Sequence, residues 1–185
     1  MRRAWPWIAA SALVVAAGAL TVLTPAEDAL TDPILVRGGM NETVTSRTLS
    51  VEVTGAQFAD RVVEADTSWE AEGNWLVVDI TASAPRSEDE ATVRLVTLEL
   101  DGRVFQASER PAETLLQSRL HVGTPIEGSV AFELPAGLRG GTGVLRVSTS
   151  SPTPLLDDVV AISVPLDEAT ASPELELTAP DWATS

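Results

Sequence analysis

The chain stands out for what it lacks: its 185 residues include no cysteine, no lysine and no tyrosine, and its one histidine is His121. Without cysteine the chain can form no disulfide, offer no thiolate to a metal and carry no lipid on a cysteine. Without lysine it has neither a Schiff-base residue nor a P-loop lysine. These absences exclude several large classes of enzymes and metalloproteins.

Basic charge is also scarce. Twelve arginines face 27 acidic residues, which gives a net charge of −15 and a pI of about 4.3. Such a surface repels phosphate backbones, so nucleic acid is not an expected partner. Apolar residues make up 44% of the chain and charged residues 21%, as in proteins with a packed core. The length fits one domain with appendages.

The N-terminal segment differs from the rest of the chain. Arg2 and Arg3 precede a stretch from Ala4 to Ala26 without a charged residue. As a helix, its apolar part would span about 30 Å, the thickness of the hydrocarbon core of a membrane. Arginines before such a helix favour a cytoplasmic N-terminus. We therefore predict a signal-anchor over residues 1–26, a single-pass helix whose membrane-contacting residues include Trp5, Trp7, Ile8 and Leu23.

A cleaved signal peptide is the alternative for this segment. Ala17–Ala19 and Thr24–Ala26 both offer the small residues that a signal peptidase needs. Both interpretations place the remaining residues outside the cytoplasm, either tethered to the cell membrane or secreted.

The part after Ala26 carries all 27 acidic residues and ten arginines, a formal charge of −17. Residues 27–47, with little periodicity and a Gly-Gly pair, are predicted to form a stalk. Residues 167–185 are predicted to form an acidic tail that is loosely attached, with Trp182 as a residue that could dock it. The domain is then expected over residues 48–166.

Alternation with a period of two dominates residues 48–166. Leu49, Val51 and Val53 alternate with polar residues, and Trp75–Ser83 is apolar on both faces, as in a central strand. Asp101-Gly102 predicts a tight hairpin turn. Residues 109–120 show helical spacing over a stretch too short for a firm helix. Seven or eight short strands with recurring turns predict an antiparallel β-sandwich.

Three segments resemble a bacterial family of extracytoplasmic immunoglobulin-like domains of unknown function, which includes the mycobacterial immunoprotective secreted antigen type. The segments are Gly73–Thr81, Leu98–Phe105 and Gly128–Pro135. The resemblance covers residues 49–166 and implies an all-β, immunoglobulin-like antiparallel β-sandwich behind an N-terminal transmembrane or signal helix. It implies no catalytic residue and no cofactor. Many relatives carry a lipid-bearing cysteine that this chain lacks.

Chemistry-bearing residues are few. His121 has no GxSxG serine motif to accompany it, and we interpret it as a loop histidine. The acidic runs at residues 88–90, 157–158 and 167–168 do not follow EF-hand spacing and are interpreted as solvated charge, with a weak calcium site as the alternative. We therefore expect no enzyme activity, no cofactor and no assigned metal ligand.

Trp69 is the candidate partner-contact residue. It lies in a polar loop between two predicted strands, and tryptophan is favoured at interface hot spots. Together with the predicted anchor and sandwich, it suggests a membrane-anchored interaction module that serves a membrane or envelope protein. The alternative is a secreted binding protein for a small ligand or a cation.

Overall fold

The structure, a computed structural model, describes residues 33–89, 91–150 and 157–183, and the predicted membrane segment lies outside them. The described residues form strands joined by turns and one turn of 3-10 helix, η2 (Leu166–Glu168). Within these ranges, no helix is long and apolar enough to cross a membrane. The strands are β1 (Ile34–Gly39), β2 (Val44–Thr45), β3 (Ser50–Glu64), β4 (Glu70–Ser83), β5 (Leu95–Leu100), β6 (Arg103–Gln106), β7 (Ile126–Leu134), β8 (Thr142–Ser148), β9 (Asp158–Pro165), β10 (Thr170–Ser172), β11 (Leu175–Leu177) and β12 (Asp181–Trp182).

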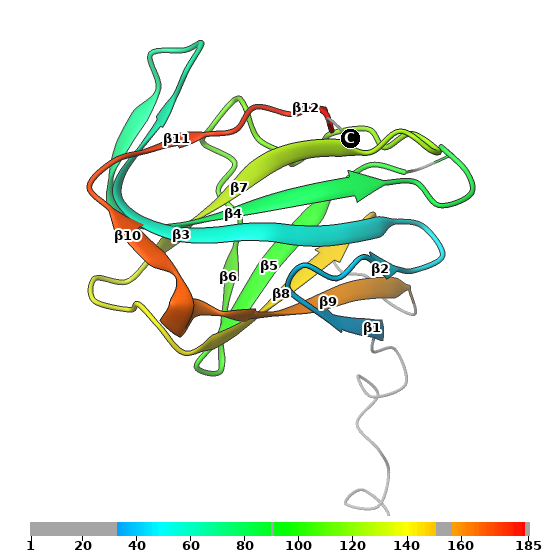
Figure 1. The fold of residues 1–185 in the computed structure, drawn as a ribbon, viewed down its shortest axis with the longest axis horizontal. Helices are drawn as coiled ribbons and strands as arrows, with labels where there is room; N and C mark the ends of the chain where they lie inside the picture. Colours follow the sequence, from blue (N-terminus) through cyan, green and yellow to red (C-terminus); the bar gives the residue numbers. More distant parts are fainter. Residues whose placement is uncertain (1–32, 90, 151–156, 184–185) are drawn as a thin grey trace, which may run out of the picture. The chain divides into compact units, whose positions relative to one another are not determined.

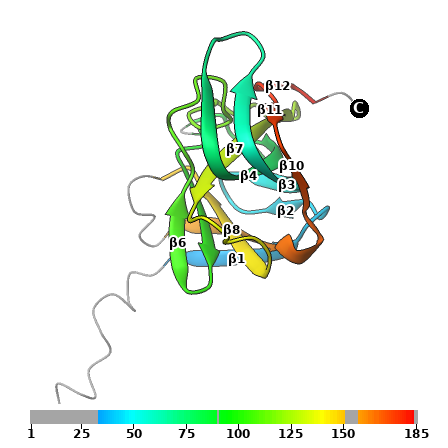
Figure 2. The same ribbon diagram turned by 90° about the vertical axis from the view of Figure 1, so that its left-hand side faces the viewer.

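The strands form two sheets, which we call sheet A and sheet B, in the two layers of a sandwich (Figures 1 and 2). Sheet A has the order β1-β9-β8-β5-β6. Sheet B has the order β10-β3-β4-β7-β12, with β2 and β11 also paired to β3. Most neighbours are antiparallel, but β1 runs parallel to β9, and β10 and β11 run parallel to β3. The prediction of an all-β fold with two sheets in a sandwich is confirmed.

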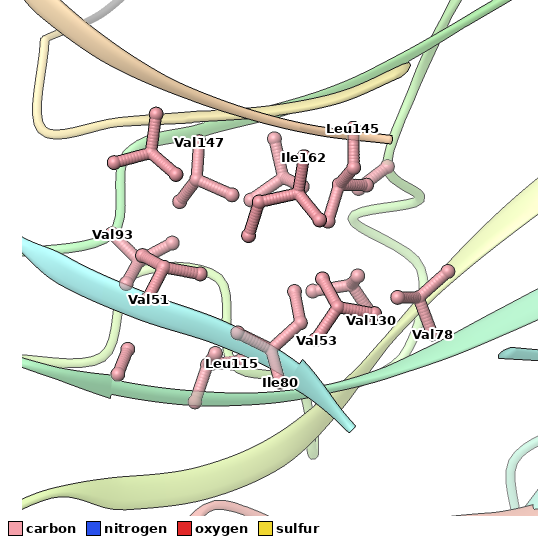
Figure 3. Close-up of a cluster of buried hydrophobic side chains, with 14 of the residues drawn as sticks. Val51, Val53, Val78, Ile80, Val93, Leu115, Val130, Leu145, Val147 and Ile162 are labelled. Carbon is pink, nitrogen blue, oxygen red and sulfur yellow. The ribbon is translucent and has the colours of Figure 1, made fainter. Parts of the chain in front are cut away.

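The main core lies between the sheets. Because side chains alternate along a strand, every second residue of β3, β4, β8 and β9 points inward. Figure 3 shows Val51, Val53 and Ile80 of sheet B opposite Leu145 and Ile162 of sheet A. All five are buried. The alternation of Val51 and Val53 with polar residues predicted the inward face of the first part of β3 correctly.

Strand β4 has a second buried face. It lies between β3 and β7, so both its edges are paired. Leu76 and Val78 point into the main core, whereas Trp75 and Val77 are buried on the outer face of sheet B. This explains why the sequence of β4 is apolar on both faces, as expected for a central strand.

The hairpin of β3 and β4 is longer than the alternation suggested. The alternation that predicted this strand ends at Val53, whereas β3 runs unbroken through Phe58 and Val62. Its register shifts between Val53 and Gly55 and again between Ala59 and Arg61. Such bulges bend a strand and interrupt its alternation, which disguises its continuity in the sequence.

The tight turn between β5 and β6 is confirmed. Asp101 and Gly102 have φ values of 51° and 70°, both in the left-handed region. A two-residue hairpin turn with positive φ at both positions matches the twist of the strands that it connects.

Two segments expected outside the domain belong to the sheets. The predicted stalk contains β1, which adds an edge strand to sheet A, and β2, which pairs with β3. The predicted tail contains η2, β10, β11 and β12. The stretch with helical spacing, residues 109–120, contains no helix; it crosses between the sheets and buries Leu115 and Leu120. The described domain therefore extends from β1 to β12.

The C-terminal strap, as we call residues 169–183, covers a second apolar cluster. It runs along β3 as β10 and β11 and then reaches β7, where it ends as β12 (Figure 1). Leu177 of the strap is buried against the outer face of sheet B. The second cluster consists of Ala59, Val62, Ala71, Trp75, Val77, Ala131 and Leu177, with Trp69 and Leu175 packed against it.

Candidate binding surfaces

Trp69, the contact residue expected from the sequence, is half-buried at the edge of the second cluster. Its ring meets that of Trp75 edge-on, with the centroids 6.3 Å apart. The guanidinium of Arg110 lies 6.0 Å from the ring centroid of Trp69 and 5.9 Å from that of Trp75. Contacts of this kind stabilise a small aromatic cluster. The structure therefore gives Trp69 a packing role, and its contact with a partner stays a prediction.

The exposed indole belongs to Trp182, in β12. It is 52% exposed, although the backbone beside it is held, because Ala183 N–H donates to the carbonyl of Pro125 at 2.9 Å. Its ring is tilted against the imidazole of His121, with centroids 5.3 Å apart. Val122, 45% exposed, follows His121 in the chain. Large apolar side chains are thus presented to solvent at this end of the domain.

A hollow of about 300 Å³ lies beside this indole. Ile126, Pro180 and Trp182 supply its apolar surface. Polar residues complete the lining: Ser118, Arg119, His121 and Asp181. Two segments far apart in sequence build it, the loop before β7 and the end of the strap.

The loop is fixed by its backbone. Leu120 is fully buried, and its N–H donates to the carbonyl of Ala91 at 2.7 Å. Ala84 N–H donates to the carbonyl of His121 at 3.1 Å. Since side chains alternate along an extended segment, burial of Leu120 directs Arg119 and His121 outward. Both line the hollow for this reason.

His121 also contacts an acid. Its Nδ1 lies 3.3 Å from Oε1 of Glu88, and the same oxygen accepts a hydrogen bond from Val122 N–H at 3.2 Å. The Val122 N–H, with His121 as a further contributor, holds the pKa of Glu88 below its usual range. The imidazole is therefore positioned by Glu88 on one side and by Trp182 on another.

The outer edge of sheet A is a second exposed surface. Strand β6 pairs with β5 and is the last strand of that sheet among the described residues. Ala107 N–H donates to the carbonyl of Val96 at 2.9 Å. In an antiparallel ladder the paired residues alternate, so the N–H groups of Val104 and Gln106 point away from β5. Val104 is 64% exposed.

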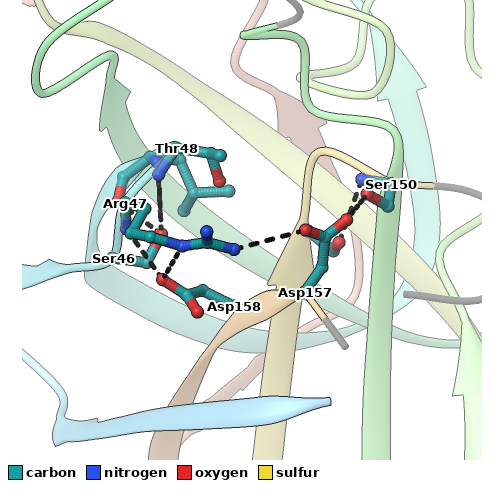
Figure 4. Close-up of polar contacts among 8 residues, drawn as sticks. Ser46, Arg47, Thr48, Ser150, Asp157 and Asp158 are labelled. Carbon is teal, nitrogen blue, oxygen red and sulfur yellow. Dashed lines mark hydrogen bonds and ion pairs between the residues drawn. The ribbon is translucent and has the colours of Figure 1, made fainter. Parts of the chain in front are cut away.

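The acidic runs are engaged in local contacts. Asp157 and Asp158 both face Arg47, whose Nε lies 3.0 Å from Oδ2 of Asp158 and whose Nη2 lies 3.5 Å from Oδ1 of Asp157 (Figure 4). Asp167 accepts a hydrogen bond from Gly141 N–H at 2.8 Å. Among the described residues, no group of three or more histidine or acidic side chains is arranged to hold a metal ion.

A buried carboxylate organises the tip of the hairpin of β3 and β4. Glu64 is 5% exposed; it accepts hydrogen bonds from the hydroxyl of Thr67 and, at 2.7 Å, from Glu113 N–H. The carboxylate of Glu113 has one oxygen buried without a hydrogen-bond partner. That burial, with Asp66 and Glu64 nearby, raises the pKa of Glu113. The cluster ties the hairpin to the loop after β6.

Sequence reasoning missed both exposed surfaces. Trp182 was noted as a residue that could dock the tail, but its pairing with Ile126 joins distant segments. Arg119 and His121 flank the buried Leu120 in a loop without a strand pattern. Exposure of the β6 edge follows from the strand order of sheet A, which a single sequence does not display.

Comparisons with known proteins gave three structural likenesses. No family model and no curated protein matches the chain. A lipoprotein candidate from Staphylococcus aureus matches with a TM-score of 0.45 and 10% identity, over 75% of this chain and 97% of that one. An uncharacterized β-sandwich protein from Clostridium difficile matches at 0.46 and 8%, over 72% and 95%. The yjhA protein from Bacillus subtilis matches at 0.44 and 13%, over 67% and 98%. These values carry no argument about function.

Proposed function

We propose that the chain is a non-catalytic interaction module, held at the outer face of a membrane by residues 1–26, that binds a protein partner along the outer edge of β6. This proposal rests on the exposure of the β6 edge and on the direction of its N–H groups. Val104 is 64% exposed, and its N–H and that of Gln106 are directed away from the sheet.

Strand addition is the mode of binding that such an edge supports. A partner segment in extended conformation would pair with the backbone of Val104 and Gln106 and so extend sheet A. Exposed edge strands are usually guarded by charge, proline or short length. Strand β6 is short and begins with Arg103, so a partner with an acidic residue near the turn would pair best with it.

We also infer that the sandwich is of the immunoglobulin type, as the resemblance implies. The chain passes from β4 in sheet B to β5 and β6 in sheet A, returns to β7 in sheet B and finishes sheet A with β8 and β9. Exchange between the sheets in this order is typical of Greek-key sandwiches. The family resemblance itself remains a prediction.

The contacts of His121 support a binding role over a catalytic one. Its ring meets Glu88 and the indole of Trp182, neither of which is an activated nucleophile.

The edge is tested by placing a photo-crosslinking residue at position 104 of the full chain in native membranes. Position 122 is the matched control, because Val122 is also an exposed valine but lies outside β6. We expect one adduct of defined mass at position 104, absent at 122 and lost when Gln106→Pro removes an outward N–H. Equal crosslinking at both positions would refute the use of this edge.

The membrane tether is tested separately by fractionation and intact mass. A tethered protein stays in the membrane fraction and begins at Met1 or Arg2. Soluble protein beginning at Leu20 or Glu27 would instead support the alternative, in which signal cleavage releases a secreted binding protein. The edge experiment then applies to the secreted form.

A further inference from the structure

We propose that the hollow beside Trp182 is a binding site for one uncharged sugar ring. The site lies apart from the β6 edge, shares no residue with it and is independent of the function proposed above. It is formed by the loop before β7 and the end of the C-terminal strap.

The apolar surface of the hollow fits the ring face of a sugar. A pyranose has faces made of C–H groups, which pack against a flat aromatic ring, and Trp182 offers a half-exposed indole beside Ile126 and Pro180. A volume of about 300 Å³ is at the lower end of small-molecule sites, so the hollow suits one ring better than a chain of rings.

The polar lining fits hydroxyl groups. A sugar hydroxyl both donates and accepts hydrogen bonds, so it needs partners of both kinds. Arg119 donates only, and the hydroxyl of Ser118 both donates and accepts. The carboxylate of Asp181 accepts only, and its Oδ1 already accepts the Trp182 N–H at 2.7 Å, which leaves Oδ2 for a ligand. Within the described part of the chain, Arg119 makes no ion pair.

The charge around the hollow disfavours an anionic ligand. Asp181 lies in the lining, Glu88 contacts His121 behind it, and Glu127 pairs with Asp181 across β7 and β12. Acidic residues therefore outnumber the single arginine of the lining and its neighbourhood. The part of the chain after Ala26 has a formal charge of −17, which repels anions at longer range. An acidic sugar would therefore bind more weakly than a neutral one.

The walls are held before a ligand arrives. Trp182 is paired with Ile126, and Pro180 lies close over Gly128, where an added Cβ would come within 3.2 Å of the Cα of Pro180. On the other side, Leu120 anchors the loop in the core. A pre-formed site loses less conformational entropy on binding, which makes weak binding of a small ring measurable.

The test is ligand-observed saturation-transfer NMR on the full chain in a zwitterionic detergent, because alkyl-glycoside detergents would compete. The probes are the methyl glycosides of glucose, galactose, mannose and N-acetylglucosamine, with methyl glucuronide as the acidic counterpart. We expect at least one neutral glycoside to bind with a dissociation constant on the order of 1 mM.

Variants locate the binding. We expect Trp182→Ala to weaken it by about tenfold or more and Arg119→Gln by about three- to tenfold, whereas Ile34→Ala, an exposed control on β1, leaves it unchanged. Arg119→Gln tests the hollow without altering β12.

Three results would overturn the proposal. The first is the absence of saturation transfer to all four neutral glycosides in the wild-type chain. The second is binding that persists unchanged in both Trp182→Ala and Arg119→Gln, which would place the sugar elsewhere. The third is tighter binding of the glucuronide, which would make the hollow an anion site built on Arg119.

Discussion

Leu177→Ala tests whether the C-terminal strap is an integral part of the folded domain. Leu177 is buried at 3% exposure against Trp75 and Val77 in the second cluster. Truncation of a buried leucine removes apolar contacts and leaves a cavity, at a cost of about 2–5 kcal/mol. Because the strap lies on the outer side of sheet B and can settle inward, we expect the lower part of that range, about 2–3 kcal/mol.

Thermal unfolding followed by circular dichroism measures this loss. For a domain of about 150 residues, each kcal/mol lowers Tm by roughly 2–4 °C, so the expected decrease is about 4–12 °C. Val104→Ala is the control; this exposed valine should change the stability by no more than about 0.5 kcal/mol.

A decrease for Leu177→Ala no larger than that of the control would refute the reasoning. It would mean that the strap opens independently, so that its contacts do not contribute to global unfolding. Hydrogen exchange at the amides of β11 distinguishes the two cases, because an integral strap exchanges with the free energy of global unfolding.

Three further predictions follow from polar groups. Burial raises the pKa of Glu113 from 4.5, so its ionisation is unfavourable in the fold, and stability falls as pH rises from 4.5 through the raised pKa. Glu113→Gln should therefore raise Tm at pH 7 and have no such effect below pH 4.5. An unchanged Tm at pH 7 would contradict this. The Val122 N–H lowers the pKa of Glu88 from 4.5, so the stability that this carboxylate contributes is present above pH 4.5 and lost as pH falls through the lowered pKa. Glu88→Gln should therefore lower Tm at pH 7, and the difference in Tm from the wild type should disappear in acid. A difference in Tm that does not depend on pH would count against this. Asn74 donates to two loop carbonyls, at 2.8 and 3.1 Å, and accepts from Nε of Arg139; in urea unfolding Asn74→Ala should cost about 1–2 kcal/mol, and a loss under about 0.5 kcal/mol would show that water replaces these bonds.

Local patterns in the sequence predicted the central strands well. Alternation identified the inward face of the first part of β3, because burial on one face of a strand imposes a period of two, and the continuous apolar run of β4 identified a central strand. Asp101-Gly102 marked its hairpin because few residues other than glycine, asparagine and aspartate adopt positive φ readily. Both signals depend on residues within one element.

The elements that the sequence did not predict depend on distant partners. β1 begins with Ile34, Leu35 and Val36, an apolar run too short to show a period of two, and it becomes a strand by pairing with β9. β10, β11 and β12 each have two or three residues, too few to show a period, and the existing edges of β3 and β7 give them their form. The sequence left open whether Trp182 docks or is exposed for the same reason, since its position is set by its pairing with Ile126.

The parallel pairing of β1 with β9 has a consequence for the order of folding. Ile34 meets Asp158, and Val62 meets Leu175, so each sheet is completed by residues more than 100 positions away. Folding is slow when loops of that length must close, because the chain loses conformational entropy before the contacts that stabilise it can form. In a chain that emerges with its N-terminus first, β1 therefore stays unpaired and the second cluster stays exposed until the last strands emerge. A chaperone that binds apolar strands would act during that interval.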